Sequence, residues 1–257
     1  MHAVPVKPEL IRWARMRAGL TVPALAEHFS KYEQWERGEA SLTLRQLEGL
    51  AKRTRTPLGY FFLPEPPVER LPVPDFRTVT DRRVRRPSPD LIETLQIMQR
   101  RQNWLREYLI EEEQPALTFV GSAKVTEEPI SVAARVRANL GLTKDWARHY
   151  PTWTDALRGL RLAIEAAGVV VTINGVVGNS TRRKLDPEEF RGFVLSDSYA
   201  PLVFVNGADA KAAQMFTLVH ELAHVWLGQG GVFSLDDLQP AEHETERWCN
   251  RVAAEFL

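Results

Sequence analysis

The chain has 257 residues, of which 44% are hydrophobic and 26% charged, so it has the composition of a globular protein with one large or two smaller domains. Basic and acidic residues number 33 each, which excludes a chain that is basic throughout and coats nucleic acid. The single cysteine, the absence of an apolar run of membrane-spanning length and the absence of an N-terminal signal pattern predict a cytoplasmic protein with no membrane partner.

Residues 1–63 are predicted to form a module of short helices, because helix caps and stop residues recur at close spacing. The predicted elements are a helix from Lys7 to about Ala18 that stops at Gly19, a helix capped by Thr21, a segment with Tyr32 and Trp35 that ends at Gly38, a helix that begins at Ser41 or Thr43, and an apolar segment at 58–63. This module has a net charge of +4, whereas the chain from His220 onward has a net charge of −5. The asymmetry indicates two functional halves.

Proline marks the end of this module. Five prolines lie between Pro64 and Pro74, and an arginine-rich stretch follows from Arg82 to Arg86. Because proline fixes φ and disfavours a helix before it, we predict a linker at 64–86 and a second domain at 87–257. The elements predicted there are a long helix from Asp90 to about Ile110, strands at 169–173, 192–195 and 202–205, a helix from about Asp209 to Leu227, and a helix from about Ala241 to the end. The fold class is therefore α+β, with a small sheet beside helices.

The strongest pattern is His220-Glu221-Leu222-Ala223-His224, inside a predicted helix. Residues four apart lie one above the other on a helix, so His220 and His224 can bind one metal ion with Glu221 beside it. Zinc peptidases use this His-Glu-x-x-His arrangement, with the glutamate as general base. The surrounding helix is apolar, and burying these side chains without a partner would cost several kcal/mol. The sequence therefore predicts a Zn²⁺ site with Glu221 as the catalytic residue.

A catalytic zinc site needs a third protein ligand, which the final predicted helix can supply. The predicted inward stripe of that helix holds Cys249, Asn250, Ala253, Ala254 and Leu257. Glu246 precedes this stripe by three to four residues and is the predicted ligand, with Glu242 and His243 as alternatives. A closed structural zinc site is another interpretation of these residues. Such sites take four protein ligands, often several cysteines, and this chain has one cysteine.

These residues resemble the ImmA/IrrE family of zinc metallopeptidases. That family pairs His-Glu-x-x-His with a downstream Glu-x-x-(Ala or Cys)-Asn-x-x-Ala-Ala helix, which residues 246–254 match, and residues 185–193 and 206–215 resemble one of its subgroups. The resemblance covers about residues 90–257. It implies a zincin-like domain, zinc ligands His220, His224 and Glu246, Glu221 as general base, and a repressor-type regulator as protein substrate. The family's helix usually continues into a further region, so we expect the sequence to be a piece of a longer protein.

Peptide hydrolysis also needs an electrophilic group that stabilises the tetrahedral intermediate. Tyr199, His149, His243 and Arg191 have suitable chemistry. Each of them also fits a role in packing or on the surface, and the sequence does not choose among them.

The N-terminal module resembles the helix-turn-helix domains of the Xre repressor class. The similarity lies in Leu25-Ala26, in Trp35-Glu36-Arg37-Gly38 and in residues 43–51. Trp35 follows Ala26 by nine positions, where typical members have about thirteen, so roughly one helical turn is missing. The loss falls at the start of the recognition helix, whose N-terminal residues read base edges. We therefore expect at most weak or non-specific DNA binding through residues 1–63, with Lys31 and Gln34 as remaining contacts.

Two functions follow from these patterns. The first is a zinc-dependent endopeptidase that hydrolyses a protein substrate and carries a module for regulation or partner binding. The alternative is a DNA-binding transcriptional regulator or antitoxin whose peptidase-like half is a sensor or a dimerisation domain. A scaffold has no need of Glu221, which favours the first.

Overall fold

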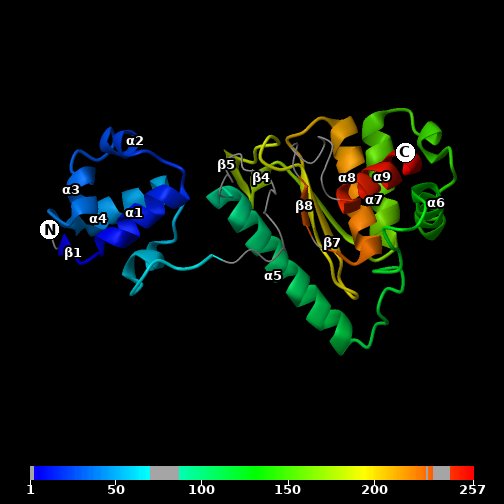
Figure 1. Cartoon of the computed structure of the whole chain (residues 1–257), viewed down its shortest axis with the longest axis horizontal. Coiled ribbons are helices and arrows are strands. Elements are labelled where there is room, and N and C mark those ends of the chain that lie inside the picture. The colour runs from blue at the N-terminus through cyan, green and yellow to red at the C-terminus, as the bar shows by residue number, and fades with distance from the viewer. Residues whose placement is uncertain (1–2, 70–86, 230, 234–243) are drawn as a thin grey trace. The chain divides into compact units, whose positions relative to one another are not determined.

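The computed structural model of the chain describes residues 3–69, 87–229, 231–233 and 244–257 (Figure 1). The described residues form two compact units, one of residues 3–69 and 87–93 and the other of those from 94 onward. The boundary between the units falls within helix α5 (Pro89–Glu111). Most of the predicted linker, residues 70–86, lies outside the described residues. Within the described residues, no helix combines the length and apolar character needed to cross a bilayer.

The first unit is helical, as predicted. Its elements are β1 (Ala3–Val4), α1 (Pro8–Arg17), α2 (Val22–Ala26), α3 (Tyr32–Arg37), β2 (Leu42–Thr43), α4 (Leu44–Arg53) and the 3-10 helix η1 (Leu58–Phe62). Thr21 caps α2, and Gly38 ends α3 in the left-handed conformation with φ of 74°. Of the two predicted starts for the fourth helix, Thr43 forms a capping box with Gln46. The antiparallel pair of β1 and β2 was not predicted.

Helix α3 is fixed to α1 by a nearly buried ion pair. Glu36 is 8% exposed, and its Oε1 accepts a hydrogen bond of 2.7 Å from Arg15 Nε and one of 2.6 Å from the Tyr32 hydroxyl. The second carboxylate oxygen accepts from Arg15 Nη2 at 3.3 Å. Tyr32 and Trp35 on the same helix are also buried. The inward side of α3 is therefore buried in the core of the first unit.

The second unit is the α+β part of the fold. After α5 its elements are α6 (Pro129–Asn139), the 3-10 helix η2 (Trp146–His149), α7 (Trp153–Ala166), β3 (Val170–Asn174), β4 (Val176–Val177), β5 (Ser180–Lys184), β6 (Gly192–Leu195), β7 (Leu202–Asn206), α8 (Lys211–Leu227), β8 (Gly231–Phe233) and α9 (Glu244–Phe256). The predicted strands correspond to β3, β6 and β7, and the predicted long helix to α5. Helices α6 and α7, the β4–β5 hairpin and β8 were not predicted.

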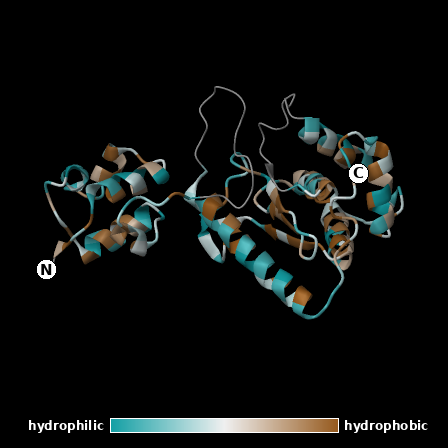
Figure 2. Ribbon diagram, turned by 60° about the horizontal axis from the view of Figure 1, so that its bottom comes forward, coloured by the Kyte–Doolittle hydropathy of each residue, from teal (hydrophilic) through white to brown (hydrophobic). Residues whose placement is uncertain are grey.

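The main sheet is mixed and has the strand order β3-β7-β6-β8. Strands β3 and β7 are parallel, whereas β6 is antiparallel to both β7 and β8. Side chains alternate between the two faces of a strand, so β7 directs Val203 and Val205 into the core shared with α8, and Leu202 and Phe204 to the opposite face. Figure 2 shows the strands coloured mainly as hydrophobic and most of α5 as hydrophilic. The main core thus lies between the sheet and helices α6–α9.

Candidate metal centre

Helix α8 carries the two histidines through the middle of the core. Apolar residues surround it on all sides, which is typical of a helix buried in a domain rather than lying on its surface. The exposed fractions are 0% for His220, 1% for Glu221 and 5% for His224. The helix ends where predicted, at Gly228, whose φ of 68° is the left-handed C-cap conformation.

Helix α9 brings Glu246 to the histidines. Trp248 Nε1 donates a hydrogen bond of 2.8 Å to the Glu127 carbonyl before α6, and Arg137 of α6 donates to the Glu255 and Phe256 carbonyls at the end of α9. The two Arg137 bonds satisfy carbonyl groups that the C-terminus of α9 leaves without a partner. The position of Glu246 is therefore fixed by helix packing as well as by its own contacts.

Three ligand atoms meet at one point. The Nε2 atoms of His220 and His224 are 3.2 Å apart, and the two Glu246 oxygens lie 3.1 Å from His220 Nε2 and 3.3 Å from His224 Nε2. A tetrahedral zinc ion with bonds of about 2.0–2.1 Å holds its ligand atoms roughly 3.3 Å apart. Two imidazoles and one carboxylate at this spacing form a candidate metal site, and they fit a catalytic zinc ion with one position left for water.

The ionisation of two of these groups suits metal binding. Burial lowers the pKa of His220 and outweighs the hydrogen bond with Glu246, so the imidazole is neutral at pH 7 and has a lone pair to donate. For Glu246, burial raises the pKa, but the hydrogen bonds with His220 and His224 outweigh it and lower the pKa well below its ordinary value. The site therefore offers a carboxylate and a neutral imidazole, the forms that bind metals.

Glu221 lies where α8 passes the first residue of β6. A Cβ atom added to Gly192 would lie 3.1 Å from Glu221 Oε1, 2.6 Å from Thr217 Cγ2 and 2.8 Å from the Phe204 carbonyl oxygen. Only a glycine leaves room for the strand to pass this close to the helix. Sequence reasoning did not single out Gly192, although a glycine in an otherwise apolar strand is a usual sign of a close approach.

We expect Gly192→Ala to lower the free energy of unfolding by about 1–3 kcal/mol, because the added methyl group overpacks the contact between strand and helix. Urea denaturation measures the change. Gly59→Ala is the matched control, since its Cβ would meet no atom within 4 Å. If Gly192→Ala were as stable as the wild type, the contact between β6 and α8 would be looser than described.

Three of the candidates for stabilising the tetrahedral intermediate, Tyr199, His149 and Arg191, lie among the described residues at different places in the fold. Tyr199 lies in the loop between β6 and β7, at the far end of β6 from Gly192, with Arg106 over its ring. His149 is exposed on η2, and its Nδ1 is 3.2 Å from the Trp146 carbonyl oxygen. Neither of them contributes to the ligand cluster found among the described residues. Arg191 precedes Gly192, and its guanidinium lies 3.5 Å from the carboxylate of Asp209. Of these three candidates, Arg191 is the closest in sequence to Gly192, the residue that lies beside Glu221.

Both alternatives for the third ligand, Glu242 and His243, lie outside the described residues. Cys249 is fully buried, and burial raises the pKa of its thiol, with the nearby charges of Glu246 and Glu221 adding to the effect. A protonated thiol is a poor metal ligand, so this cysteine has a packing role. Asn250, one turn after Glu246, interacts with the His220 side chain, as an outer partner of a ligand histidine does.

Comparison with known protein families places part of the chain. Residues 164–257 match the family model of the IrrE N-terminal-like domain, a peptidase family. The match runs from the end of α7 to the end of the chain and contains strands β3–β8 and both helices of the cluster, α8 and α9. No curated protein and no solved structure matches the chain. The metallopeptidase character of this domain thus rests on the family match together with the cluster of His220, His224 and Glu246.

Proposed function

We propose that the IrrE-like domain of this chain is a zinc-dependent endopeptidase. The observation that carries the proposal is the triangle of two imidazole nitrogens and one carboxylate, with Glu221 beside it on the same helix. The match to a peptidase family supports the same reaction. The site contains an acid–base residue that a purely structural metal site does not need.

Each residue has a distinct role in this proposal. His220, His224 and Glu246 hold the ion. A zinc ion bound there supplies Lewis acidity, which polarises a carbonyl group and makes a water molecule more acidic. Glu221 accepts the proton of the attacking water and passes it to the amide nitrogen that leaves. Because Glu221 is 1% exposed, its carboxylate acts in a site from which bulk water is largely excluded.

We propose a repressor-type regulator in the cytoplasm as the substrate, the class implied by the resemblance to the ImmA/IrrE family. Incubation of the purified chain with candidate repressors from the same cell, followed by mass spectrometry of the products, tests this proposal. Cleavage should stop when 1,10-phenanthroline removes the metal and return when one equivalent of Zn²⁺ is added. Cleavage that persists after complete metal removal would contradict the mechanism.

We further propose that residues 1–63 bind a protein rather than a specific DNA operator. Helix α3, which lies where the resemblance to the Xre class places the recognition helix, has only six residues and buries three of them. Its exposed side carries Glu33, which pairs with Arg37 at 3.3 Å, and Arg37 is also 3.5 Å from Glu39. Arg37 is thus paired with two carboxylates and is not available for a DNA phosphate or base. The same carboxylates repel the DNA backbone.

Selection from a random duplex library tests this assignment. We expect the whole chain to enrich no single motif, and any binding to weaken steeply with salt, because only the net charge of the module attracts the duplex. A motif bound about 10³-fold or more above background at physiological salt would favour the alternative function, a DNA-binding regulator or antitoxin.

A further inference from the structure

A pocket lies on the sheet face that points away from α8. Its volume is about 500 Å³, and it is lined by Ile97, Arg100, Arg101, Gln102, Trp104, Leu105, Val170 and Leu202. Val170 and Leu202 are register partners at the start of β3 and β7. The pocket therefore lies where α5 crosses these strands, whereas Gly192 beside Glu221 pairs with Val205 at the other end of β7.

The helix that forms one wall is fixed in place. The Gln102 amide is 5% exposed, and its Nε2 donates hydrogen bonds of 2.7 Å to the Leu195 carbonyl and 2.9 Å to the Ala200 carbonyl. One turn later, Arg106 forms an ion pair of 2.9 Å with Asp197 in the same loop. These contacts join α5 to the loop between β6 and β7, so the pocket exists before any ligand binds. A preformed site avoids the entropic cost of ordering its walls on binding.

The lining combines an aliphatic wall with an open aromatic face. Ile97, Leu105, Val170 and Leu202 contribute hydrocarbon surface. Trp104 is 65% exposed, and its ring stacks on Tyr108 with centroids 5.8 Å apart and an angle of 8° between the planes. The stack fixes the orientation of the indole, which leaves a large aromatic surface in water. A flat apolar ring would recover this surface by stacking on it.

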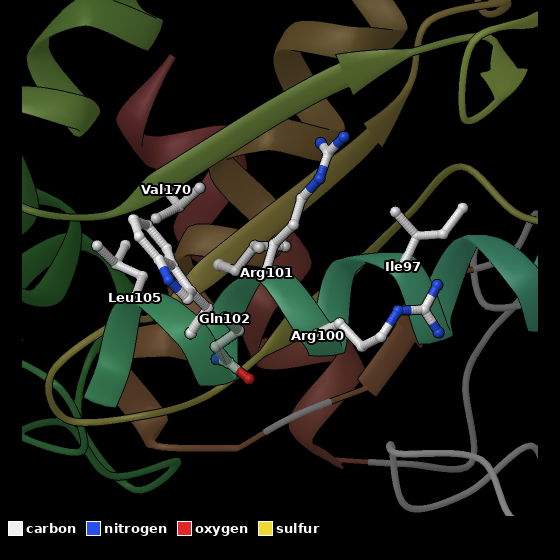
Figure 3. A pocket seen from close by; sticks show the side chains of 8 residues that line it. Ile97, Arg100, Arg101, Gln102, Leu105 and Val170 are labelled. Atoms are coloured by element: carbon white, nitrogen blue, oxygen red, sulfur yellow. The ribbon is translucent and has the colours of Figure 1, made fainter. Parts of the chain in front are cut away.

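Two arginines, Arg100 and Arg101, also line this pocket. In Figure 3, Arg101 lies between Ile97 on one side and Leu105 with Val170 on the other, and Arg100 is next to Ile97. Neither guanidinium has a hydrogen-bond or ion-pair partner in the part of the chain that the structure describes, and no acidic residue lines the pocket. A guanidinium binds carboxylate and other oxyanions through two parallel N–H donors.

We propose that this pocket binds a small planar aromatic anion, with its ring between Trp104 and the aliphatic wall and its acid group on Arg101, while Arg100 adds positive charge at the same pocket. The volume lies within the range of small-molecule sites, which combine mostly apolar walls with a few polar groups that fix orientation. The site is separate from the metal centre, and its occupation does not depend on the proposed peptidase activity.

Isothermal titration calorimetry of the 257-residue chain with naphthalene-1-carboxylate tests the proposal. We expect binding in the millimolar range or tighter, and binding of the neutral naphthalene-1-carboxamide about tenfold weaker. The double variant Arg100→Gln, Arg101→Gln should weaken the acid about tenfold and leave the amide unchanged. Trp104→Leu should weaken both compounds, because both lose the stacking contact.

Helix α7 offers matched controls. Trp153 is also 65% exposed, and Arg158 is an exposed arginine, but neither lines this pocket. Trp153→Leu and Arg158→Gln should therefore leave both affinities unchanged. Absence of binding, equal affinity for acid and amide, or indifference to the α5 variants would overturn the proposal. Binding of a single-stranded oligonucleotide that depends on Trp104, without binding of the acid, would also overturn it in favour of a nucleic-acid surface.

Discussion

Replacing Glu221 with glutamine should reduce peptide hydrolysis by a factor of about 10²–10⁴, the usual contribution of a general base, while the bound zinc stays at its wild-type level. Glutamine has the shape of glutamate and fits the narrow space beside Gly192, but its amide cannot accept the proton of the attacking water. The variant also removes a buried charge, so we expect it to fold. The measurement is the initial rate of product formation, with metal content determined on the same sample.

Two results would contradict this assignment in different ways. A Glu221→Gln protein that cleaves at nearly the wild-type rate would show that another group is the base. A protein that loses its zinc would show that Glu221 is a ligand. Glu244→Gln at the exposed start of α9 is the control for a change of charge alone, and it should alter neither the rate nor the metal content.

The double variant His220→Ala, His224→Ala should lose the bound metal, falling from about one zinc per chain to almost none. Both imidazoles are buried, and their Nε2 atoms supply two corners of the ligand triangle. Elemental analysis of protein purified without added metal gives the number. Unchanged zinc in the variant would place the metal elsewhere in the chain.

Single substitutions on the last helix distinguish its carboxylates. Glu246→Ala should weaken zinc binding more than Glu242→Ala, and Glu244→Ala should leave it unchanged. Competition with a metal indicator gives the three affinities. A larger loss with Glu242→Ala than with Glu246→Ala would make Glu242 the third ligand. Because Glu246 is held as a carboxylate by its hydrogen bonds with the histidines, its removal also leaves two buried imidazoles without that partner.

The local features of the fold could be predicted from the sequence. Thr21, Gly38 and Gly228 mark helix ends because caps and left-handed stops depend on a few neighbouring residues. The spacing of His220 and His224 is likewise a local property of one helix. Helices α6 and α7 were missed, although their apolar residues contribute to the main core.

The inward face of α9 shows where such reasoning stops. The predicted stripe included Ala254 and Leu257, but both are exposed, and the buried face instead holds Trp248, Val252 and Phe256. Small residues fit either face of a helix, whereas the large aromatic residues determine which face is buried. The contact of Gly192 with Glu221 and the pocket beside α5 could not be predicted, because each joins segments far apart in the chain.

The arrangement of the ligand triangle on two helices has a consequence for folding. His220 and His224 belong to α8 and Glu246 to α9, so an ion bound to all three would act as a cross-link that closes the chain between His224 and Glu246 into a loop. Cross-links of this kind reduce the conformational entropy of the unfolded chain, and metal affinity then becomes part of the free energy of folding. Zinc supply would thus set how firmly the last helix is anchored, as well as whether catalysis is possible.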